Sequence, residues 1–357
     1  MNKRLIYNTQ NKYTNDDLKI MQGWNLDRKI QVTQTRIIEW YQKFEGKIYV
    51  SFSGGKDSTV LLDLARRIYP NIEAVFIDTG LEFPEIRKFV KEYDNVTWLK
   101  PEMNFKKVIE TYGYPLISKE VAQKIYEARR KPDGAYAKRF EEDSEYATKY
   151  GGRYSLVRWR WLRDSDLPIS GKCCDIMKKK PAKIYEKQTG NKPIIATLAS
   201  ESNVRKQRWM KDGCNAFNSI RPISTPMSFW TEQDVYEYII RYIKPKYEVA
   251  WNNAQFAHGS IRNTARKFLR KHGYSKTGIA SIYGDIVCDK NGKYHTTIRD
   301  RTGCVFCGFG CHLEKEPNRF QKLKQTHPKL WKYCMKPLDE GGLGMREALE
   351  FIGVKVE

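Results

Sequence analysis

The chain has 357 residues, of which 40% are hydrophobic and 30% are charged, which suits one large α/β domain with an appendage or two domains. Its 64 Lys and Arg against 42 Asp and Glu leave a net charge of +22, so the surface attracts phosphate groups unless the basic residues only form a solvated face. Residues 1–22 are polar, and no apolar run approaches the ~20 residues that span a bilayer. We therefore expect a cytoplasmic protein with no membrane partner, whose eight cysteines are reduced.

The first 46 residues are expected to form a helical lead-in, because apolar residues recur at helical spacing between Val32 and Phe44. Ile48–Phe52 has the composition of a buried strand and runs directly into a glycine-rich turn. Thr59–Ile68 has the pattern of a helix. A strand, a turn and a helix in this order indicate the start of a βαβ unit.

Three further strands extend the predicted sheet, at Ile72–Asp78, Val96–Leu99 and Pro193–Ala199. Helical patterns lie between them, which is typical of a parallel sheet. We expect one nucleotide-binding domain over residues 47–243.

A basic and aromatic region at about residues 112–172 interrupts this domain, and its helical stretch at Lys119–Arg130 predicts a helical insertion. Later, Thr231 is the predicted N-cap of a helix that reaches Ile239. Residues 244–357 contain most of the remaining cysteines and are expected to form a basic, cysteine-rich C-terminal module.

The segment Ser53-Gly54-Gly55-Lys56-Asp57-Ser58 has the composition of a phosphate-binding loop. Its two glycines let backbone N–H groups approach an anion, and the N-terminus of the next helix adds a partial positive charge. Lys56 supplies a cation, while Ser53 and Ser58 supply hydroxyls. The spacing is not that of a Walker loop. A simple turn is the alternative, but the ordered strand, loop, helix and second strand favour nucleotide binding.

The same six residues resemble the PP-loop of the ATP pyrophosphatases, also called adenine nucleotide α-hydrolases. Three later segments resemble successive parts of the phosphoadenosine phosphosulfate (PAPS) reductase family: Asp78–Glu85, Ser200–Arg205, and Pro222-Ile223 followed by Trp230–Val235. The four matches occur in the family's order and cover roughly residues 47–240.

This resemblance implies a Rossmann-like parallel sheet of the adenine nucleotide α-hydrolase type, with ATP and Mg²⁺ at the carboxyl ends of its strands. It also implies that ATP is cut between its α and β phosphates, so that a substrate is adenylated and pyrophosphate leaves. The implied catalytic residues are Lys56, Asp57, Asp78 and Arg205, with Asp57 or Asp78 positioning Mg²⁺. The implied nucleotide-binding residues are Ser51, Ser53, Gly54, Gly55, Lys56, Asp57, Ser58, Asp78, Thr79 and Gly80. Structural ion pairs are the alternative role for Arg205 and for Arg208.

A candidate metal site is formed by Cys173, Cys174, Cys304, Cys307 and Cys311. The last three thiols lie within eight positions, among glycines that permit a tight backbone. The adjacent pair, followed by Lys178–Pro181, together with the later C-x-x-C resembles the [4Fe–4S] arrangement of assimilatory adenylylsulfate reductases. We therefore expect Cys174, Cys304 and Cys307 to bind a cluster together with either Cys173 or Cys311. A structural Zn²⁺ site is the main alternative.

Three isolated cysteines, Cys214, Cys288 and Cys334, are expected to be buried and structural. His312 directly follows Cys311 and could act as a ligand. A surface position, or one behind the ligands, is more typical of such a histidine.

Two departures from the sulfonucleotide reductases favour sulfur transfer over reduction. The chain lacks their Glu-Cys-Gly-x-His tail, and it keeps the Gly54–Asp57 core, which suits cleavage of ATP. The combination looks more like ATP-dependent thiolation proteins that modify tRNA or DNA. In those proteins adenylation creates a leaving group, and sulfur from a donor such as a cysteine desulfurase replaces it. The alternatives are a phosphoadenylyl- or adenylyl-sulfate reductase, a sulfate adenylyltransferase small subunit, and a non-catalytic nucleotide-binding subunit of a larger assembly.

Basic and aromatic residues alternate at Arg153-Tyr154 and again over Arg158–Arg163. Guanidinium groups can pair with phosphates while indoles stack on bases, so nucleic acid is a candidate partner beside the adenine nucleotide. Tryptophans packed into a core are the alternative. A second basic stripe at helical spacing comprises Arg262, Arg266, Lys267, Arg270 and Lys271, with a solvated helix face as its alternative.

Overall fold

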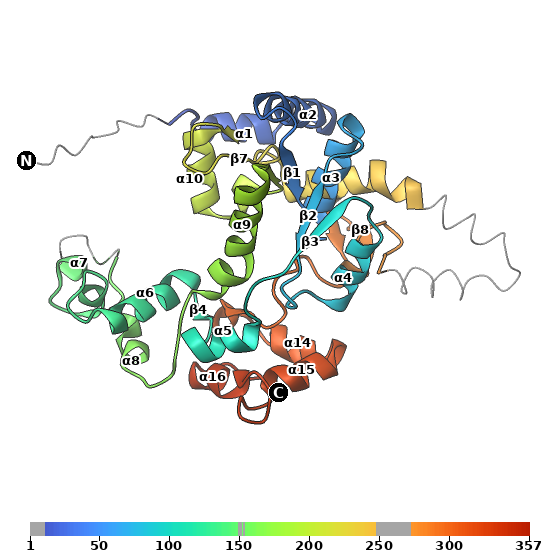
Figure 1. The fold of residues 1–357 in the computed structure, drawn as a ribbon. Helices are drawn as coiled ribbons and strands as arrows, with labels where there is room; N and C mark the ends of the chain where they lie inside the picture. The colour runs from blue at the N-terminus through green and yellow to red at the C-terminus, as the bar shows by residue number, and fades with distance from the viewer. Residues whose placement is uncertain (1–10, 149–151, 153, 248–272) are drawn as a thin grey trace, which may run out of the picture. The chain divides into compact units, whose positions relative to one another are not determined.

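The computed structural model describes residues 11–148, 152, 154–247 and 273–357 (Figure 1). It divides into two compact units. The first comprises Met1–Asp78, Glu82–Leu99 and Ile184–Thr302, and the second comprises Thr79–Leu81, Lys100–Lys183 and Gly303–Glu357. These units do not coincide with the predicted domains, because the C-terminal module predicted at 244–357 is shared between them.

A six-stranded sheet forms the centre of the first unit, with the strand order β3-β2-β1-β5-β7-β6. Its strands are β1 (Ile48–Ser51), β2 (Ala74–Ile77), β3 (Val96–Leu99), β5 (Lys192–Ile195), β6 (Asn215–Ala216) and β7 (Ile223–Ser224). All neighbours pair in parallel except β6 and β7, which are antiparallel. The predicted α/β class and parallel sheet are thereby confirmed.

The strand order contains a switch point beside β1. The chain leaves β1 for β2 and β3 on one side, and it later returns to β5 on the other side. Ser51, the last residue of β1, is in register with Val75 of β2 and with Ile195 of β5. The loops that follow β1 and β5 therefore start side by side, at the place where open α/β sheets bind ligands.

The strands and helices of this unit enclose its core. Residues such as Val50, Ala74 and Ile194 are fully buried, as expected for parallel strands covered on both faces. The helices with residues in this unit are α1 (Asn15–Gln22), α2 (Leu26–Lys43), α3 (Lys56–Ile68), α4 (Pro84–Lys91), α9 (Lys180–Thr189), α10 (Asn203–Asp212) and α11 (Glu232–Tyr238). A π-helical turn (Ile239–Ile243), the 3₁₀ turns Ala199–Glu201 and Ser281–Tyr283, and the hairpin β8 (Ile286–Cys288) and β9 (Tyr294–Thr296) complete it.

Local sequence signals agree with several of these elements. Helix α6 occupies the predicted residues Lys119–Arg130, and the Thr231 hydroxyl caps α11 by accepting from the Asp234 N–H. Helix α3 starts three residues before the predicted helix, because Gly55 acts as its N-cap. The strand predicted at Pro193–Ala199 is shorter, since β5 ends at Ile195 and a 3₁₀ turn begins at Ala199.

The second unit is mostly helical. It contains α5 (Phe105–Tyr112), β4 (Leu116–Ile117), α6 (Lys119–Arg130), a 3₁₀ turn (Ala137–Phe140), α7 (Glu145–Thr148), a second 3₁₀ turn (Val157–Trp159), α8 (Arg160–Arg163) and a π-helical turn (Asp175–Lys179). Its C-terminal part contains β10 (Gly308–Phe309), a 3₁₀ turn (Cys311–Leu313), α14 (Arg319–Thr326), α15 (Pro328–Met335) and α16 (Met345–Phe351). Strands β4 and β10 pair in parallel, which joins the predicted insertion to the C-terminal segment.

Among the residues that the structure describes, no helix is both long enough and apolar enough to cross a membrane. The basic stripe predicted between Arg262 and Lys271 lies outside the described residues.

Candidate functional site

The predicted phosphate loop connects β1 to α3, and its shape depends on Gly54. The φ angle of Gly54 is +70°, and a Cβ atom there would lie 2.7 Å from Cγ2 of Val90 and 2.9 Å from Cγ2 of Ile86. Only glycine therefore fits without moving α4. Gly55 is the N-cap of α3 and makes no side-chain hydrogen bond to the N-terminal N–H groups of the helix, which attract anions.

Two serine hydroxyls hold this loop together. The Ser58 hydroxyl accepts from the backbone N–H of Ser53 at 3.2 Å and lies 3.1 Å from the Ser53 hydroxyl. It also donates to the carbonyl of Gly55 at 2.9 Å. Both predicted hydroxyls thus lie within the loop and fix its backbone.

Lys56 is almost fully buried, with 2% of its side chain exposed. Its ammonium group donates to the carbonyl of Asp300 at 2.8 Å and pairs with the carboxylate of Glu232 at 2.9 Å. The predicted phosphate cation therefore also fastens the loop to α11 and to the segment around Asp300.

Arg205, Arg301 and Asp57 form a charged group at the N-terminal end of α3. Burial raises the pKa of Asp57, against the opposing effect of Lys56, and Glu232 and Arg301 also act on this carboxyl. Burial lowers the pKa of Arg205, and the positive charge of Arg301 lowers it further.

One carboxylate holds both guanidinium groups of this cluster. Arg205 forms an ion pair with Glu201, and Arg301 lies 3.6 Å from the same carboxylate. Two cations near a helix N-terminus are an arrangement that favours an anionic ligand. Arg208 instead pairs with Asp212 of its own helix at 3.9 Å, which is the structural ion pair considered above as its alternative role.

The other predicted nucleotide residues lie in different surroundings. Asp78 is buried, and its carboxylate accepts from Arg87 at 2.7 Å, so its charge is partly neutralised by α4. Thr79 and Gly80 belong to the second unit together with Leu81. Ser51 ends β1 immediately before the loop.

Several residues at the loop were missed by sequence reasoning. The Tyr283 hydroxyl accepts from the Lys56 N–H at 3.4 Å and lies 2.6 Å from the Thr302 hydroxyl. Burial raises the pKa of Tyr283 to about 12, so this hydroxyl is neutral near pH 7 and can donate as well as accept. Tyr283, Arg301 and Thr302 lie more than 200 positions after the loop, and no local pattern signals their role.

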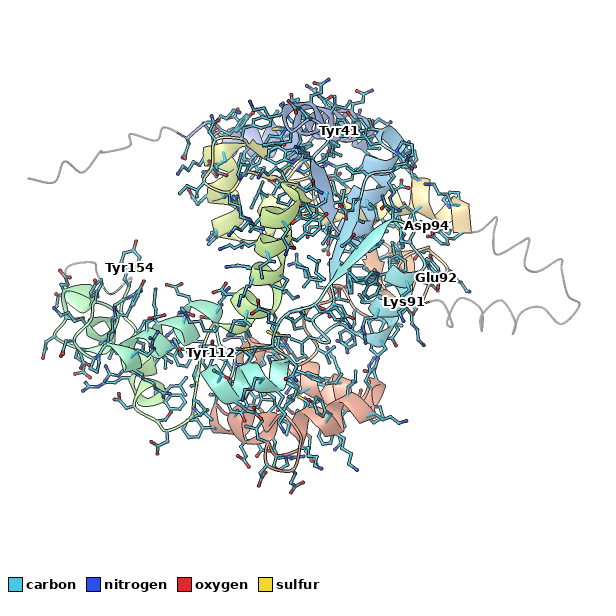
Figure 2. All side chains as sticks on the ribbon, viewed as in Figure 1. Tyr41, Lys91, Glu92, Asp94, Tyr112 and Tyr154 are labelled. Atoms are coloured by element: carbon cyan, nitrogen blue, oxygen red, sulfur yellow. The ribbon has the colours of Figure 1, made fainter. Side chains whose placement is uncertain are left out.

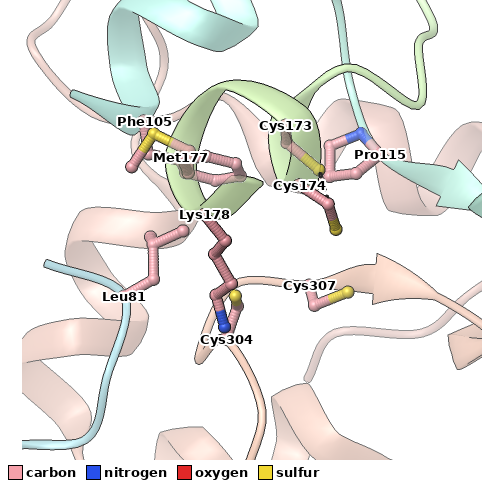
Figure 3. Close-up of a pocket in the computed structure, with 9 residues that line it drawn as sticks. All are labelled: Leu81, Phe105, Pro115, Cys173, Cys174, Met177, Lys178, Cys304 and Cys307. Carbon is pink, nitrogen blue, oxygen red and sulfur yellow. Dashed lines mark hydrogen bonds between the residues drawn. The ribbon is translucent and has the colours of Figure 1, made fainter. Parts of the chain in front are cut away.

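In the second unit, four of the five candidate cysteines line one cavity (Figure 3). Cys173 and Cys174 come from the start of a helical turn, and Cys304 and Cys307 lie on a separate segment across the cavity. The remaining lining residues are Leu81, Phe105, Pro115, Met177 and Lys178.

The thiols of this cavity differ in acidity. The Sγ atoms of Cys173 and Cys174 are 4.0 Å apart, and the hydrogen bond from Cys173 lowers the pKa of Cys174, with help from the positive charges of Lys119 and Lys178. Burial raises the pKa of Cys307. Cys174 is therefore more easily held as a thiolate, the form that binds metals, than Cys173 or Cys307.

Cys311 does not line this cavity. Its thiol is buried and donates to the carbonyl of Gly308 at 2.9 Å. Within the described parts of the chain, no three His, Cys, Asp or Glu side chains are grouped to hold a metal ion as they stand. The cavity nevertheless contains the thiol donors and the largely apolar wall that suit an iron–sulfur cluster.

The isolated cysteines only partly match expectation. Cys214 and Cys334 are buried, as predicted, but Cys288 is exposed. The prediction was wrong for Cys288 because β8 belongs to a two-stranded hairpin, in which Val287 and Cys288 are both exposed. His312 packs edge-on against Trp159 and is not among the residues that line the cavity.

Comparison with known proteins matches one part of the chain to a protein family. Residues 47–132 match the family model described as the phosphoadenosine phosphosulfate reductase domain. An uncharacterised protein of Methanocaldococcus jannaschii is 41% identical over 102 residues, which are 26% of this chain and 25% of that protein. The chain thus spans about a quarter of that relative's length.

Several relatives are named for an activity. The adenosine 5'-phosphosulfate reductase of Staphylococcus epidermidis is 27% identical over 166 residues, covering 38% of this chain and 68% of that protein. The enzyme of the same name from Geobacillus thermodenitrificans is 27% identical over 212 residues, which cover 58% of this chain and 70% of that protein. A crystal structure of the PAPS reductase of Candida auris, in a phosphate complex, covers 63% of this chain and 85% of that one at 14% identity, with a TM-score of 0.33.

Proposed function

Because residues 47–132 match the phosphoadenosine phosphosulfate reductase domain, we propose that this chain belongs to that family and is an ATP pyrophosphatase that adenylates an acceptor for sulfur transfer. The observation that carries the proposal is the Ser53–Ser58 loop at the switch point of the sheet, with Arg205 and Arg301 at the end of α3. A loop of this kind suits a polyphosphate ligand.

The proposed reaction is displacement at the α-phosphorus of ATP. An acceptor oxygen forms a bond to this phosphorus, the bond to the β-phosphate oxygen breaks, and pyrophosphate leaves with the electron pair. Lys56, the N-terminus of α3 and the Ser53 and Ser58 hydroxyls would hold the leaving phosphates, while Arg205 and Arg301 would neutralise developing charge. Mg²⁺, for which Asp57 is the candidate ligand, would contribute further charge neutralisation.

The cysteine cavity supports sulfur chemistry as the second half of the proposal. We propose Cys173, Cys174, Cys304 and Cys307 as the ligands of a [4Fe–4S] cluster, with Zn²⁺ as the alternative metal. The four thiols line one cavity, and four cysteine thiolates are the ligand set that such a cluster takes. When bound, such a cluster would supply redox or sulfur-binding chemistry, and a cysteine desulfurase would be a suitable sulfur donor.

Reduction of a sulfonucleotide is the second candidate function. It is favoured by the relatives named adenosine 5'-phosphosulfate reductase, which cover up to 58% of this chain. The same loop and arginines could then hold the phosphate and sulfate groups of the substrate.

The two functions release different products. Anaerobically purified protein is incubated with Mg²⁺, ATP and single-stranded RNA or DNA oligonucleotides, and in parallel with adenylyl sulfate and a dithiol reductant. Pyrophosphate and AMP-linked oligonucleotide in the first reaction support the proposal. Sulfite and AMP in the second reaction alone would replace it with the reductase. Nucleotide binding with no product in either reaction would contradict both and support a non-catalytic subunit.

A further inference from the structure

Two aromatic side chains meet at the surface of the second unit although they lie far apart in the sequence. Trp161 of α8 is 49% exposed, and Phe351 at the end of α16 is 48% exposed. Their ring centroids are 5.8 Å apart with an interplanar angle of 33°. Residues of this size are usually buried, so two of them left half-exposed in mutual contact present a shared aromatic surface.

A neighbouring aromatic side chain positions a cation. The guanidinium of Arg158 lies 5.0 Å from the ring centroid of Trp159, and Trp159 packs edge-on against His312 at 5.7 Å. Within the described residues, no carboxylate forms an ion pair with the exposed Arg158. Its charge is therefore available to an external anion, while Trp159 restricts where the guanidinium can lie.

Arg160 lies between Trp159 and Trp161 in the sequence and, unlike Arg158, forms ion pairs with carboxylates. It pairs with Glu141 at 3.3 Å and with Asp164 at 3.7 Å, so its charge is shared. The next exposed aromatic residue is Tyr154, which is 45% exposed and lies on the helical insertion (Figure 2). Exposed rings and guanidinium groups thus alternate along one segment of the second unit.

We propose that Trp161, Phe351 and Arg158 form a binding surface for single-stranded nucleic acid. Bases stack on exposed aromatic rings regardless of their sequence, and Arg158, three positions before Trp161 in the chain, would bind a phosphate of the same strand. The net charge of +22 favours such a polyanion over a neutral protein surface. A membrane surface is less suited, because the patch consists of separate rings and charges rather than a continuous aliphatic face.

This inference deepens the proposed function, because it gives the chemical class of the acceptor. It does not depend on turnover, since binding is measured without ATP. A failure of catalysis would therefore leave the binding surface standing, and a failure of binding would leave the nucleotide site standing.

The test measures fluorescence anisotropy of labelled single-stranded RNA and DNA oligonucleotides of about 16 nucleotides at low ionic strength. We expect Trp161→Ala and Phe351→Ala each to weaken binding roughly tenfold, while Trp161→Phe retains most of it. Arg158→Ala is expected to lower the slope of log K against log salt by about 0.7, the effect of one phosphate contact.

The matched control is Tyr333→Ala, which removes an exposed aromatic side chain from α15 of the same unit. It should bind as the wild type does, and thermal unfolding of every variant confirms that the fold is intact. The inference is overturned if the wild-type protein binds neither oligonucleotide, or if Trp161→Ala and Phe351→Ala bind as tightly as Tyr333→Ala. Binding to anionic lipid vesicles or to a protein, without oligonucleotide binding, would also overturn it.

Discussion

At the scale of single residues, the conformation of the phosphate loop depends on a few residues that no other residue type can replace. Gly54 is required by its φ of +70° and by the closeness of Val90. Lys56 is required by its two partners, Glu232 and the Asp300 carbonyl, which leave 2% of its side chain exposed. A change at either position therefore alters both the local backbone and the charge at the end of α3.

We expect Lys56→Ala to reduce ATP turnover by about 100-fold or more. The substitution removes a cation that stabilises the negative charge developing on the leaving phosphates, and it leaves the Glu232 carboxylate without its ion-pair partner. Pyrophosphate release under saturating ATP measures the effect. Lys211→Ala, which changes an exposed lysine on α10, is the control and should turn over normally. Wild-type turnover in the Lys56 variant would remove this residue from the mechanism.

Asp57 allows a prediction about stability. Burial raises its pKa, so ionisation is less favourable in the folded protein than in the unfolded chain. Folding stability is then lost as pH rises above the ordinary pKa of an aspartate and through the raised value. We expect Asp57→Asn to raise the urea midpoint of the nucleotide-free protein at pH 7 while lowering ATP turnover. A lower midpoint in this variant would show that the carboxylate stabilises the fold.

At the scale of elements, a buried ion pair joins the first long helix to the helix after the sheet. Lys29 of α2 donates to Asp234 of α11 at 2.6 Å and to the carbonyl of Gln22 at 2.7 Å. The side chain of Lys29 is 2% exposed. Asp234 also accepts from Thr231, so one carboxylate caps α11 and anchors α2.

We expect Lys29→Met to destabilise the protein by about 3 kcal/mol or more, because it leaves the Asp234 carboxylate buried without its cation. The free energy of urea unfolding measures the loss. Lys19→Met breaks the exposed pair with Asp16 and should change stability by about 0.5 kcal/mol or less. Equal effects of the two substitutions would contradict the importance of burial.

At the scale of the whole molecule, the chain builds each unit from segments that are distant in the sequence. The second unit brings residues 173–174 and 304–307 to one cavity, and it leaves Cys311 bonded to Gly308. The first unit brings Tyr283 and Thr302 to the loop after β1. Both candidate sites therefore depend on long-range packing.

The cysteine cavity makes a prediction about metal content. We expect Cys173→Ser, Cys174→Ser, Cys304→Ser and Cys307→Ser each to lose most of the iron and sulfide of anaerobically purified protein, together with absorbance near ~400 nm. Cys311→Ser should retain them, because its hydroxyl can replace the hydrogen bond to Gly308. Equal loss in Cys311→Ser would make Cys311 a ligand, and one zinc per chain with no iron would refute the cluster.

By itself, the sequence determined the features that depend on local pattern and chemistry. Apolar runs predicted β1 to β3, helical spacing predicted α6, and the N-cap residue Thr231 predicted the start of α11. The Gly-Gly-Lys-Asp core located the phosphate loop. These signals are readable because neighbouring residues alone decide backbone conformation at a strand, a cap or a glycine turn.

Only the tertiary structure decided which distant segments complete each candidate site. It placed Tyr283, Thr302 and Arg301 at the loop, chose Cys173 over Cys311 for the cavity, and divided residues 273–357 between the two units. It also left Cys288 exposed on a hairpin. The physical reason is that contacts between residues hundreds of positions apart arise from packing and burial of the whole chain, which leave no periodic pattern in any one segment.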